Sequence, residues 1–253
     1  MSDFIALFQL PDQPLSFVLA MLAVVAAYAV FTLIGFGSAL LASAPLVQVM
    51  PVARVIPMLA LLDFAGSALR GWRARHELAW QELRLLLPGM LGGQLLGVFV
   101  LARLPAAPMA IALGLFVAYQ GANGLLAGKK SDLLARSPLA SGLLGGVLGG
   151  LFGSGGFIYA ACLERRLESR ASFRATQAVL IALSTGWRIC LCLFMGLLDL
   201  HLLATTLMFV PAMLSGIYLG HHLDLRLGRE QLFRLLNTLL LASGLSLLFR
   251  FAS

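Results

Sequence analysis

The sequence predicts an all-α integral membrane protein made of two inverted-topology repeats, each a broken helical hairpin followed by three transmembrane helices. Three observations lead to this prediction. Apolar runs of about 20 residues fill most of the chain, basic residues gather in short segments between them, and glycine clusters interrupt two of the runs. The chain has 253 residues, of which 60% are hydrophobic and 11% charged, and its mean hydropathy is +0.94. So little remains outside the runs that a soluble domain of ordinary size is excluded.

Six continuous apolar runs are long enough to cross a membrane, since about 20 helical residues cover the hydrocarbon core. They lie roughly at residues 52–71, 83–102, 106–127, 175–198, 201–220 and 231–250. Two further segments, 15–50 and 139–163, contain the clusters Gly35-Phe36-Gly37-Ser38 and Gly153-Ser154-Gly155-Gly156. A break of this kind frees backbone polar groups, which hydrocarbon tolerates only where protein or a water-filled cavity covers them. Paired breaks in corresponding halves are typical of the substrate site of a transporter.

The basic residues indicate how these segments are inserted. Lysines and arginines cluster at 70–84, 129–136, 165–174 and 226–229, and the positive-inside rule assigns these segments to the cytoplasm. A single segment, 139–163, joins two of them, so we expect it to enter the membrane and return to the same face. The nearly uncharged N-terminus and the loop around Pro51 predict that segment 15–50 does the same from the opposite face.

Each half therefore has the same plan, and the connection between the halves carries glycine and proline at its ends. We predict repeat 1 at residues 1–127, a cytoplasmic linker at 128–137 and repeat 2 at 138–253. Two rows of glycines recur every four residues, which allows close helix approach: Gly89, Gly93 and Gly97, and Gly142, Gly146 and Gly150. We assign these rows to helix packing, with a homodimer contact left open.

The return arm of each hairpin is predicted to begin at its glycine cluster, so two helix N-termini should lie at membrane depth. Unpaired N–H groups and the helix dipole favour an anion there. Arg188 falls near the middle of the run 175–198, where an unpaired charge is costly, and a guanidinium matches the geometry of an oxyanion. The predicted substrate-binding residues are Gly37, Ser38, Ala39, Ser154, Gly155, Gly156, Phe157, Thr176, Gln177 and Arg188.

Asp63 lies near the middle of the equivalent run in the first half and has two interpretations. It could form a structural ion pair with Arg188. It could also couple transport to protons, because burial favours the uncharged acid and brings its titration toward neutrality, although a nearby arginine opposes this. The coupling ion could therefore be a proton or another ion.

Other polar residues within the runs suit interhelical hydrogen bonds, although they could also line the cavity: Gln94, Gln120, Asn123, Gln177, Ser184, Thr185 and Asn237. Cys162, Cys190 and Cys192 are interpreted as small core residues. The histidines His201, His221 and His222 lie at run ends without further ligands, so we predict no metal site and no cofactor. No catalytic or nucleotide-binding motif is present, and the basic residues form no continuous patch with stacking aromatics, which argues against nucleic acid.

With these features the chain resembles the TauE/SafE family of anion permeases, a duplicated unit with a glycine-rich break near the start of each half. The resemblance lies in Gly35-Phe36-Gly37-Ser38 through Pro45, and in Gly150-Leu151-Phe152-Gly153-Ser154-Gly155-Gly156 with Phe173-Arg174-Ala175-Thr176-Gln177 downstream. It covers essentially the whole chain. The first break has Ser38 and Ala39 where the family commonly has more glycines, which argues against a strictly symmetric site. The resemblance implies transport of sulfite, sulfonates such as sulfoacetate or taurine, or related small anions across a bacterial inner membrane.

The residues by themselves predict a secondary transporter for a small anion that works by alternating access, not an enzyme. A passive anion channel is one alternative. An intramembrane enzyme acting on lipid head groups is another, but it would need a nucleophile with a base or a metal set that the sequence does not offer.

Overall fold

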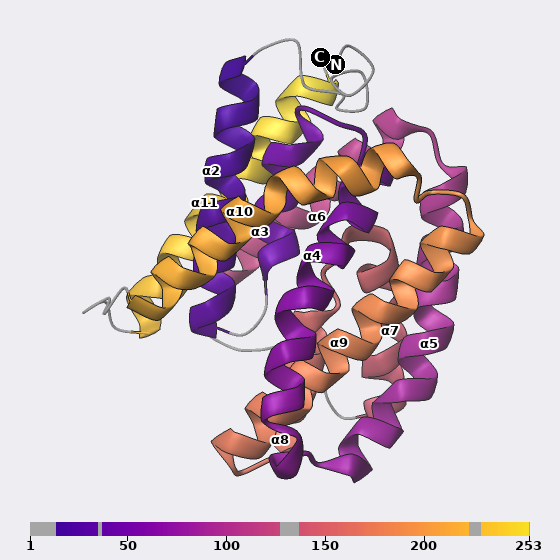
Figure 1. Ribbon diagram of the computed structural model, residues 1–253, viewed down its shortest axis with the longest axis vertical. Helices are drawn as coiled ribbons and strands as arrows, with labels where there is room; N and C mark the ends of the chain where they lie inside the picture. The colour runs from indigo at the N-terminus through magenta and orange to yellow at the C-terminus, as the bar shows by residue number, and fades with distance from the viewer. Residues whose placement is uncertain (1–13, 35–36, 127–136, 223–228, 253) are drawn as a thin grey trace.

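The computed structural model describes residues 14–34, 37–126, 137–222 and 229–252, and all its regular structure in these ranges is helical (Figure 1). The elements are α2 (Pro14–Ile34), α3 (Ser38–Val47), α4 (Val52–Arg73), the 3₁₀ turn η1 (Arg75–Glu77), α5 (Trp80–Arg103), α6 (Ala106–Leu126), α7 (Pro138–Phe152), α8 (Gly156–Arg166), α9 (Arg170–Phe194), α10 (Leu200–His222) and α11 (Arg229–Ala252). The predicted all-α fold is confirmed.

Each of the six continuous apolar runs forms one long helix, and each interrupted segment forms a long and a short helix. Among the described residues, α5, α6, α9 and α10 are long and apolar enough to cross a membrane. Gly35, Phe36, most of the predicted linker and the basic residue Arg226 lie outside the described residues. The division into repeats at 128–137 stays a prediction.

Helix α9 begins earlier and ends earlier than the run 175–198 indicated. It starts at Arg170, where the Ser169 side chain caps it by accepting a hydrogen bond from Ser172 N. It ends at Phe194 because Gly196 adopts a φ of 70°, a left-handed conformation that stops a helix. Arg188 therefore lies six residues before the end of α9 rather than near its middle.

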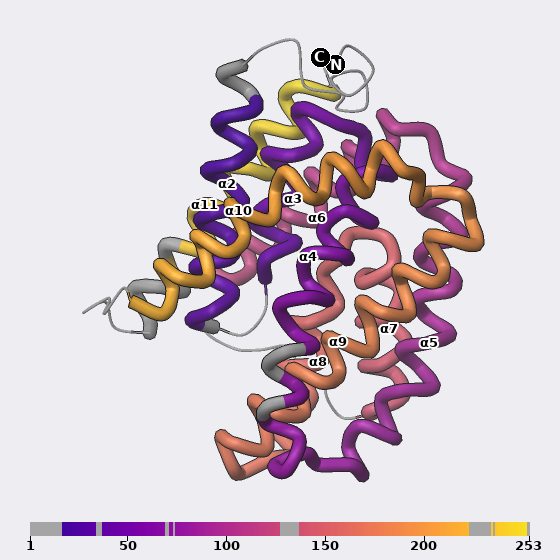
Figure 2. Tube along the Cα trace, in the orientation of Figure 1, coloured from indigo at the N-terminus to yellow at the C-terminus, as the bar shows by residue number. Residues whose placement is uncertain are grey.

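The two hairpins point toward each other from opposite ends of the molecule. The hairpin α2–α3 lies in the upper part of Figures 1 and 2, and α8 returns to the lower end. In each hairpin the short arm packs against the long one, α3 on α2 and α8 on α7, and then against the helix that follows it, α4 or α9. Both short arms therefore begin in the interior of the molecule.

The principal helix pairs are symmetric between the two halves of the chain. Helix α4 packs against α9 and α6 against α11, and each of these pairs joins corresponding helices. Helix α5 packs against α7 and α10 against α2, so exchanging the halves converts one pair into the other. This is the pattern expected of two repeats related by a two-fold axis.

Both predicted glycine rows serve helix packing inside the chain. A Cβ on Gly89, Gly93 or Gly97 of α5 would overlap a backbone carbonyl oxygen of α7, and a Cβ on Gly142 or Gly146 would overlap one of α5. The rows thus face each other at backbone contact, as small residues permit. Neither row is left free for contact with a second copy of the chain.

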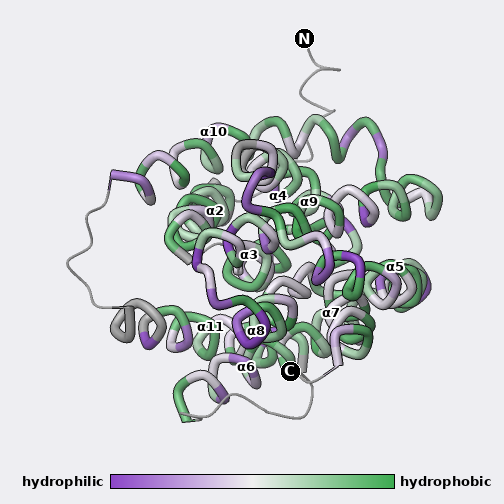
Figure 3. The backbone as a smooth tube through the Cα atoms, turned by 90° about the horizontal axis from the view of Figure 1, so that it is seen from below, coloured by the Kyte–Doolittle hydropathy of each residue, from purple (hydrophilic) through white to green (hydrophobic). Residues whose placement is uncertain are grey.

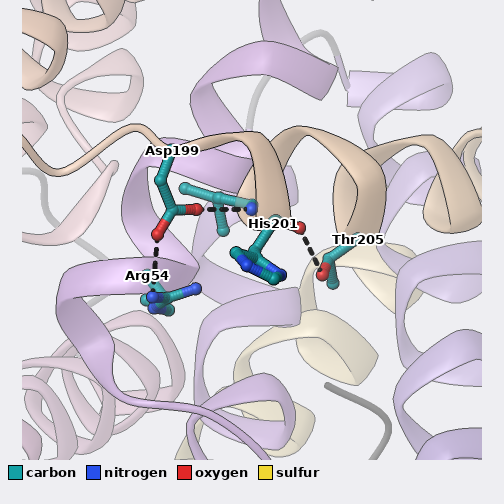
Figure 4. Close-up of polar contacts among 5 residues, drawn as sticks. Arg54, Asp199, His201 and Thr205 are labelled. Carbon is teal, nitrogen blue, oxygen red and sulfur yellow. Dashed lines mark hydrogen bonds and ion pairs between the residues drawn. The ribbon is translucent and has the colours of Figure 1, made fainter. Parts of the chain in front are cut away.

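Each of two ion pairs joins two segments that the charge pattern predicts on the same side of the membrane. Arg166 at the end of α8 binds Glu82 at the start of α5 through Nε and through Nη2, which lies 3.1 Å from Oε1. Seen from below in Figure 3, the end of α8 is hydrophilic. Arg54 near the start of α4 binds Asp199 before α10 at 2.9 Å, and Asp199 also accepts a hydrogen bond from Leu202 N (Figure 4).

Candidate functional site

A small internal pocket lies where the two hairpin turns meet, and its lining comes from both hairpins and from α4 and α9. Eight of the ten predicted substrate-binding residues line it, together with Asp63: Gly37, Ser38, Ala39, Ser154, Gly155, Gly156, Phe157 and Arg188. Gly37 and Arg188, which are 151 positions apart in the sequence, thus share one cavity of about 30 Å³.

The first turn presents the N-terminus of α3 to this pocket. Gly37 has a φ of 96°, which an L side chain rarely adopts, and the helix begins directly after it at Ser38. Gly37, Ser38, Ala39 and Leu40 all line the pocket. The first backbone N–H groups of a helix have no intrahelical acceptor, so this end offers donors and a partial positive charge.

The second turn joins the end of α7 to the start of α8. Gly153 closes α7 with a φ of 73° and donates its N–H to Gly149 O at 3.0 Å. A Cβ on Gly153 would lie 2.9 Å from Ala39 Cβ and 3.0 Å from Arg188 Nη1, so the first hairpin and α9 both approach this glycine. Helix α8 begins at Gly156 and presents a second helix N-terminus to the pocket.

Arg188 is the cation of the pocket and is only 2% exposed. Its Nη1 donates to Gly149 O at 2.7 Å, near the C-terminal end of α7, where the helix dipole favours a positive charge. Its Nε is buried and makes no hydrogen bond to any part of the chain that the structure describes. A buried donor of a charged group without an acceptor is costly, and an anion in the pocket would supply that acceptor.

Asp63 is the acidic group of the pocket and is 4% exposed. Two hydroxyl groups donate to the same oxygen, Oδ1: Tyr28 Oη from α2 at 2.7 Å and Ser38 Oγ from α3 at 2.7 Å. Asp63 therefore ties the first hairpin to α4, and Ser38 stands both in this network and in the pocket lining.

Two predicted residues, Thr176 and Gln177, do not line the pocket. Thr176 Oγ1 accepts a hydrogen bond from Ala79 N at 3.0 Å, which connects α9 to the start of α5. Gln177 Nε2 donates to Gly156 O at 2.7 Å and so holds the first residue of α8. Gln177 touches the second hairpin at its turn, and its role in substrate binding stays a prediction.

Tyr159 and Phe31 also line the pocket, although they are not among the residues predicted from the sequence. Tyr159 is buried, and its hydroxyl interacts with the Ser184 side chain of α9 but makes no hydrogen bond of good geometry within the described residues. A Cβ on Gly155 would lie 3.1 Å from this hydroxyl, so the hydroxyl lies beside the start of α8. Its spacing was an available signal, because residue 159 follows Gly156 by three positions and helical residues at that spacing share a face.

Two polar residues named only as general candidates, Ser184 and Thr185, line the pocket from α9. Thr185 Oγ1 donates back to Ile181 O at 2.8 Å within its own helix. Ser184 Oγ accepts a hydrogen bond from Gln94 Nε2 of α5 at 2.6 Å, while Gln94 Oε1 is buried without a partner among the described residues. The α9 wall of the pocket is therefore polar at two neighbouring positions.

Comparison with known proteins gives two matches that cover most of the chain. The family model described as sulfite exporter TauE/SafE matches residues 19–247. The chain is also similar to a Comamonas testosteroni protein named "probable inner membrane transporter protein TsaS", with 30% identity over 194 residues, which are 75% of this chain and 81% of that protein. No solved structure matches.

Proposed function

This chain belongs to the sulfite exporter TauE/SafE family, and we propose that its pocket binds a small sulfur-containing anion that the protein moves across the membrane. The protein is a multi-pass inner-membrane transporter. The proposed substrates are sulfite or a sulfonate such as sulfoacetate or taurine, and the proposed mechanism is alternating access. The observation that carries the proposal is the meeting of two helix N-termini and Arg188 in one pocket.

The chemistry of the lining favours a compact oxyanion head group. The starts of α3 and α8 supply backbone N–H donors, and Arg188 supplies a charge with an uncommitted Nε. Tyr159, which lines the pocket from α8, adds a neutral hydroxyl donor. A sulfonate or sulfite group has three oxygen acceptors, so it can accept from several of these donors at once.

The size of the cavity supports movement during transport. Its volume of about 30 Å³ has room for about two water molecules. A sulfonate enters only if the two hairpin turns move apart or one of them shifts. Hairpins that enter from opposite ends suit such a change, because each could open the pocket toward its own side.

Anion binding and transport by Arg188 variants test the proposal. Purified protein should be stabilised against heat by sulfoacetate, taurine or sulfite more than by acetate, and proteoliposomes should take up the stabilising anion. Arg188→Ala should weaken binding at least about tenfold, since a hydrogen bond to a charged group contributes about 1.5–3 kcal/mol. Arg188→Lys keeps the charge but not the planar guanidinium. Its affinity for the anion should lie between those of the unmodified protein and Arg188→Ala.

Arg84→Ala is the matched control, because Arg84 is exposed on α5 away from the pocket lining. Unchanged anion binding and flux in Arg188→Ala would remove Arg188 from the site. A passive channel would let the anion equilibrate but never accumulate against its gradient, whatever ion gradient is imposed, so uphill uptake separates the two functions. Hydrolysis of lipid head groups by the same proteoliposomes would instead support the enzyme alternative.

A further inference from the structure

The hydrogen-bond network of Asp63 extends from outside the pocket into its wall. Tyr28 does not line the pocket, whereas Ser38 and Asp63 do. Both hydroxyls donate to Asp63 Oδ1 at 2.7 Å. An oxygen that accepts two hydroxyl hydrogens at this distance is that of an ionised carboxylate or the carbonyl oxygen of the acid. Ser38 thus joins this carboxyl group to the start of α3 in the pocket wall.

A serine hydroxyl has one hydrogen and can donate it to only one acceptor at a time. While Asp63 is ionised, the carboxylate holds that hydrogen in a charge-assisted bond, and the Ser38 oxygen offers lone pairs to its other neighbours. Lone pairs repel an anion. The neutral acid is a weaker acceptor, so protonation of Asp63 would release the Ser38 hydrogen to an anion at the start of α3.

The charged groups that face Asp63 also favour protonation of Asp63 when an anion binds. Arg188 of α9 lines the same pocket, as does the Tyr159 hydroxyl of α8, and Tyr28 donates from α2. Helices α3 and α7 contain no titratable residue, and on α6 and α10 the groups Tyr119, His201, Tyr218, His221 and His222 are exposed. On α5 and η1 the groups Arg84, Arg75, His76 and Glu77 are exposed as well.

One carboxylate and one guanidinium therefore dominate the charge of the pocket. They offset each other while the pocket is empty of anion. The sulfonate group of an incoming anion leaves one negative charge in excess in this buried site, where charge interactions are strong. A proton on Asp63 removes that excess.

We propose that Asp63 binds one proton together with each transported anion and that the Ser38 hydroxyl couples the two events. The proton comes from the side to which the pocket is open, adds to the Asp63 carboxylate, and leaves on the side where the anion is released. No covalent bond of the substrate changes. The inference rests on the proposed function and assigns it a co-transported ion.

Proton uptake on anion binding is the direct test in the full-length protein. Sulfoacetate is added to purified protein in weak buffer between about pH 6 and about pH 8, where ordinary carboxylates and sulfonates stay ionised, and a pH-indicator dye reports proton uptake. The expected result is up to one proton taken up per anion bound. The dissociation constant should rise by up to about tenfold per pH unit on the alkaline side.

Three variants separate a coupling role from a structural one. Asp63→Asn should bind sulfoacetate with little pH dependence and without proton uptake, and should lose accumulation driven by a pH gradient. Ser38→Ala should bind more weakly and take up fewer protons per anion. Tyr28→Phe leaves the pocket lining intact but removes one donor to the carboxylate, so the pH of half-maximal binding should rise.

The outcomes distinguish this inference from the function on which it rests. Sulfoacetate binding that depends on Arg188 but takes up no proton and does not vary with pH would overturn the inference and leave the proposed function standing. Absence of binding by every sulfur anion tested would overturn both. If Asp63→Asn does not fold, proton uptake by the wild-type protein and the pH of half-maximal binding in Tyr28→Phe decide the question. An unchanged pH of half-maximal binding in Tyr28→Phe would contradict the proposed role of the hydrogen-bond network.

Discussion

At the scale of single residues, the pocket combines polar groups that a folded protein rarely buries without partners. Arg188 Nε is buried and makes no hydrogen bond within the described residues, and Tyr159 Oη is buried beside Ser184 without a hydrogen bond of good geometry. Such groups lower stability while the site is empty, and a ligand that accepts from them recovers the loss. Their position beside two helix N-termini distinguishes this pocket from an ordinary packing defect.

Tyr159→Phe should weaken anion binding without destabilising the protein. The substitution removes one hydrogen-bond donor to a charged ligand, worth about 1.5–3 kcal/mol, which corresponds to about a ten- to hundredfold loss of affinity. It also removes a buried hydroxyl that makes no hydrogen bond of good geometry, so the melting temperature without anion should change little. Titration of sulfoacetate by thermal shift measures both quantities.

The matched control is Tyr218→Phe, since Tyr218 is 63% exposed and lies outside the pocket lining. Its affinity and melting temperature should equal those of the unmodified protein. A Tyr159→Phe protein that melts at lower temperature and binds the anion normally would show that the hydroxyl serves the fold rather than the ligand.

At the scale of helices, glycine has two different structural roles in this chain. At Gly37 and Gly153 it allows a positive φ and so ends or begins a helix at the pocket. Along α5 and α7 it has ordinary helical geometry and lets two backbones touch. The two roles meet in the second hairpin, because α7 leads directly into the turn at Gly153 and its position depends on the contact with α5.

Gly93→Val should therefore destabilise the protein, whereas Gly92→Val should be tolerated. A Cβ at residue 93 would overlap Leu143 O of α7, but one at residue 92 meets nothing within 4 Å. Both substitutions carry the same cost in helix propensity, so the difference reports the packing alone. Overpacking of this kind costs about 1–3 kcal/mol or more.

Thermal unfolding followed by size-exclusion chromatography in detergent measures that difference. Gly93→Val should unfold at clearly lower temperature than Gly92→Val. Equal melting temperatures would mean that α5 and α7 are not in backbone contact in the membrane-extracted protein.

At the scale of the whole molecule, the arrangement of helices agrees with two halves inserted in opposite senses. The connection after α3 and the connection after α8 occupy corresponding places in the two halves, yet they lie toward opposite ends of the molecule (Figure 1). The ion pair Arg166–Glu82 joins two basic segments, and Arg54–Asp199 joins two segments expected on the other face. Opposite insertion thus predicts which connections face each side of the membrane, and cysteine labelling tests this.

Cysteines at Pro51 and Glu168 should be reached by a membrane-impermeant thiol reagent from opposite faces. Both residues are exposed in the connections that follow α3 and α8. A background of Cys190→Ser removes the exposed native cysteine, and Cys162 and Cys192 are buried. Pro51→Cys should be labelled in right-side-out vesicles and Glu168→Cys in inside-out vesicles.

A second pair, Glu77→Cys and Leu200→Cys, provides an independent control. Both positions are exposed: Glu77 lies in the connection α4–α5, and Leu200 is the first residue of α10, directly after the corresponding connection α9–α10. Glu77→Cys should react from the cytoplasmic face and Leu200→Cys from the other. Labelling of either pair from a single face would rule out inverted insertion.

The sequence by itself determined the helices, the positions of both breaks and the residues at the hairpin tips. Apolar run length and glycine clusters are local signals, and they located the starts of α3 and α8 at Ser38 and Gly156 correctly. Charge counting, which depends only on loop composition, predicted which segments share a face.

Only the tertiary structure decided which side chains of the long helices reach the pocket. Thr176 and Gln177 were predicted from their sequence proximity to the second hairpin; they do not line the pocket, and they bond to Ala79 and to the pocket residue Gly156. Tyr159, and the hydrogen bonds from Tyr28 and Ser38 to Asp63, depend on how α2, α3, α4 and α8 rotate against one another. In a chain this apolar, hydrophobic periodicity does not fix helix rotation, because lipid and core select the same residues, and the packing of small residues and buried hydrogen bonds fixes it instead.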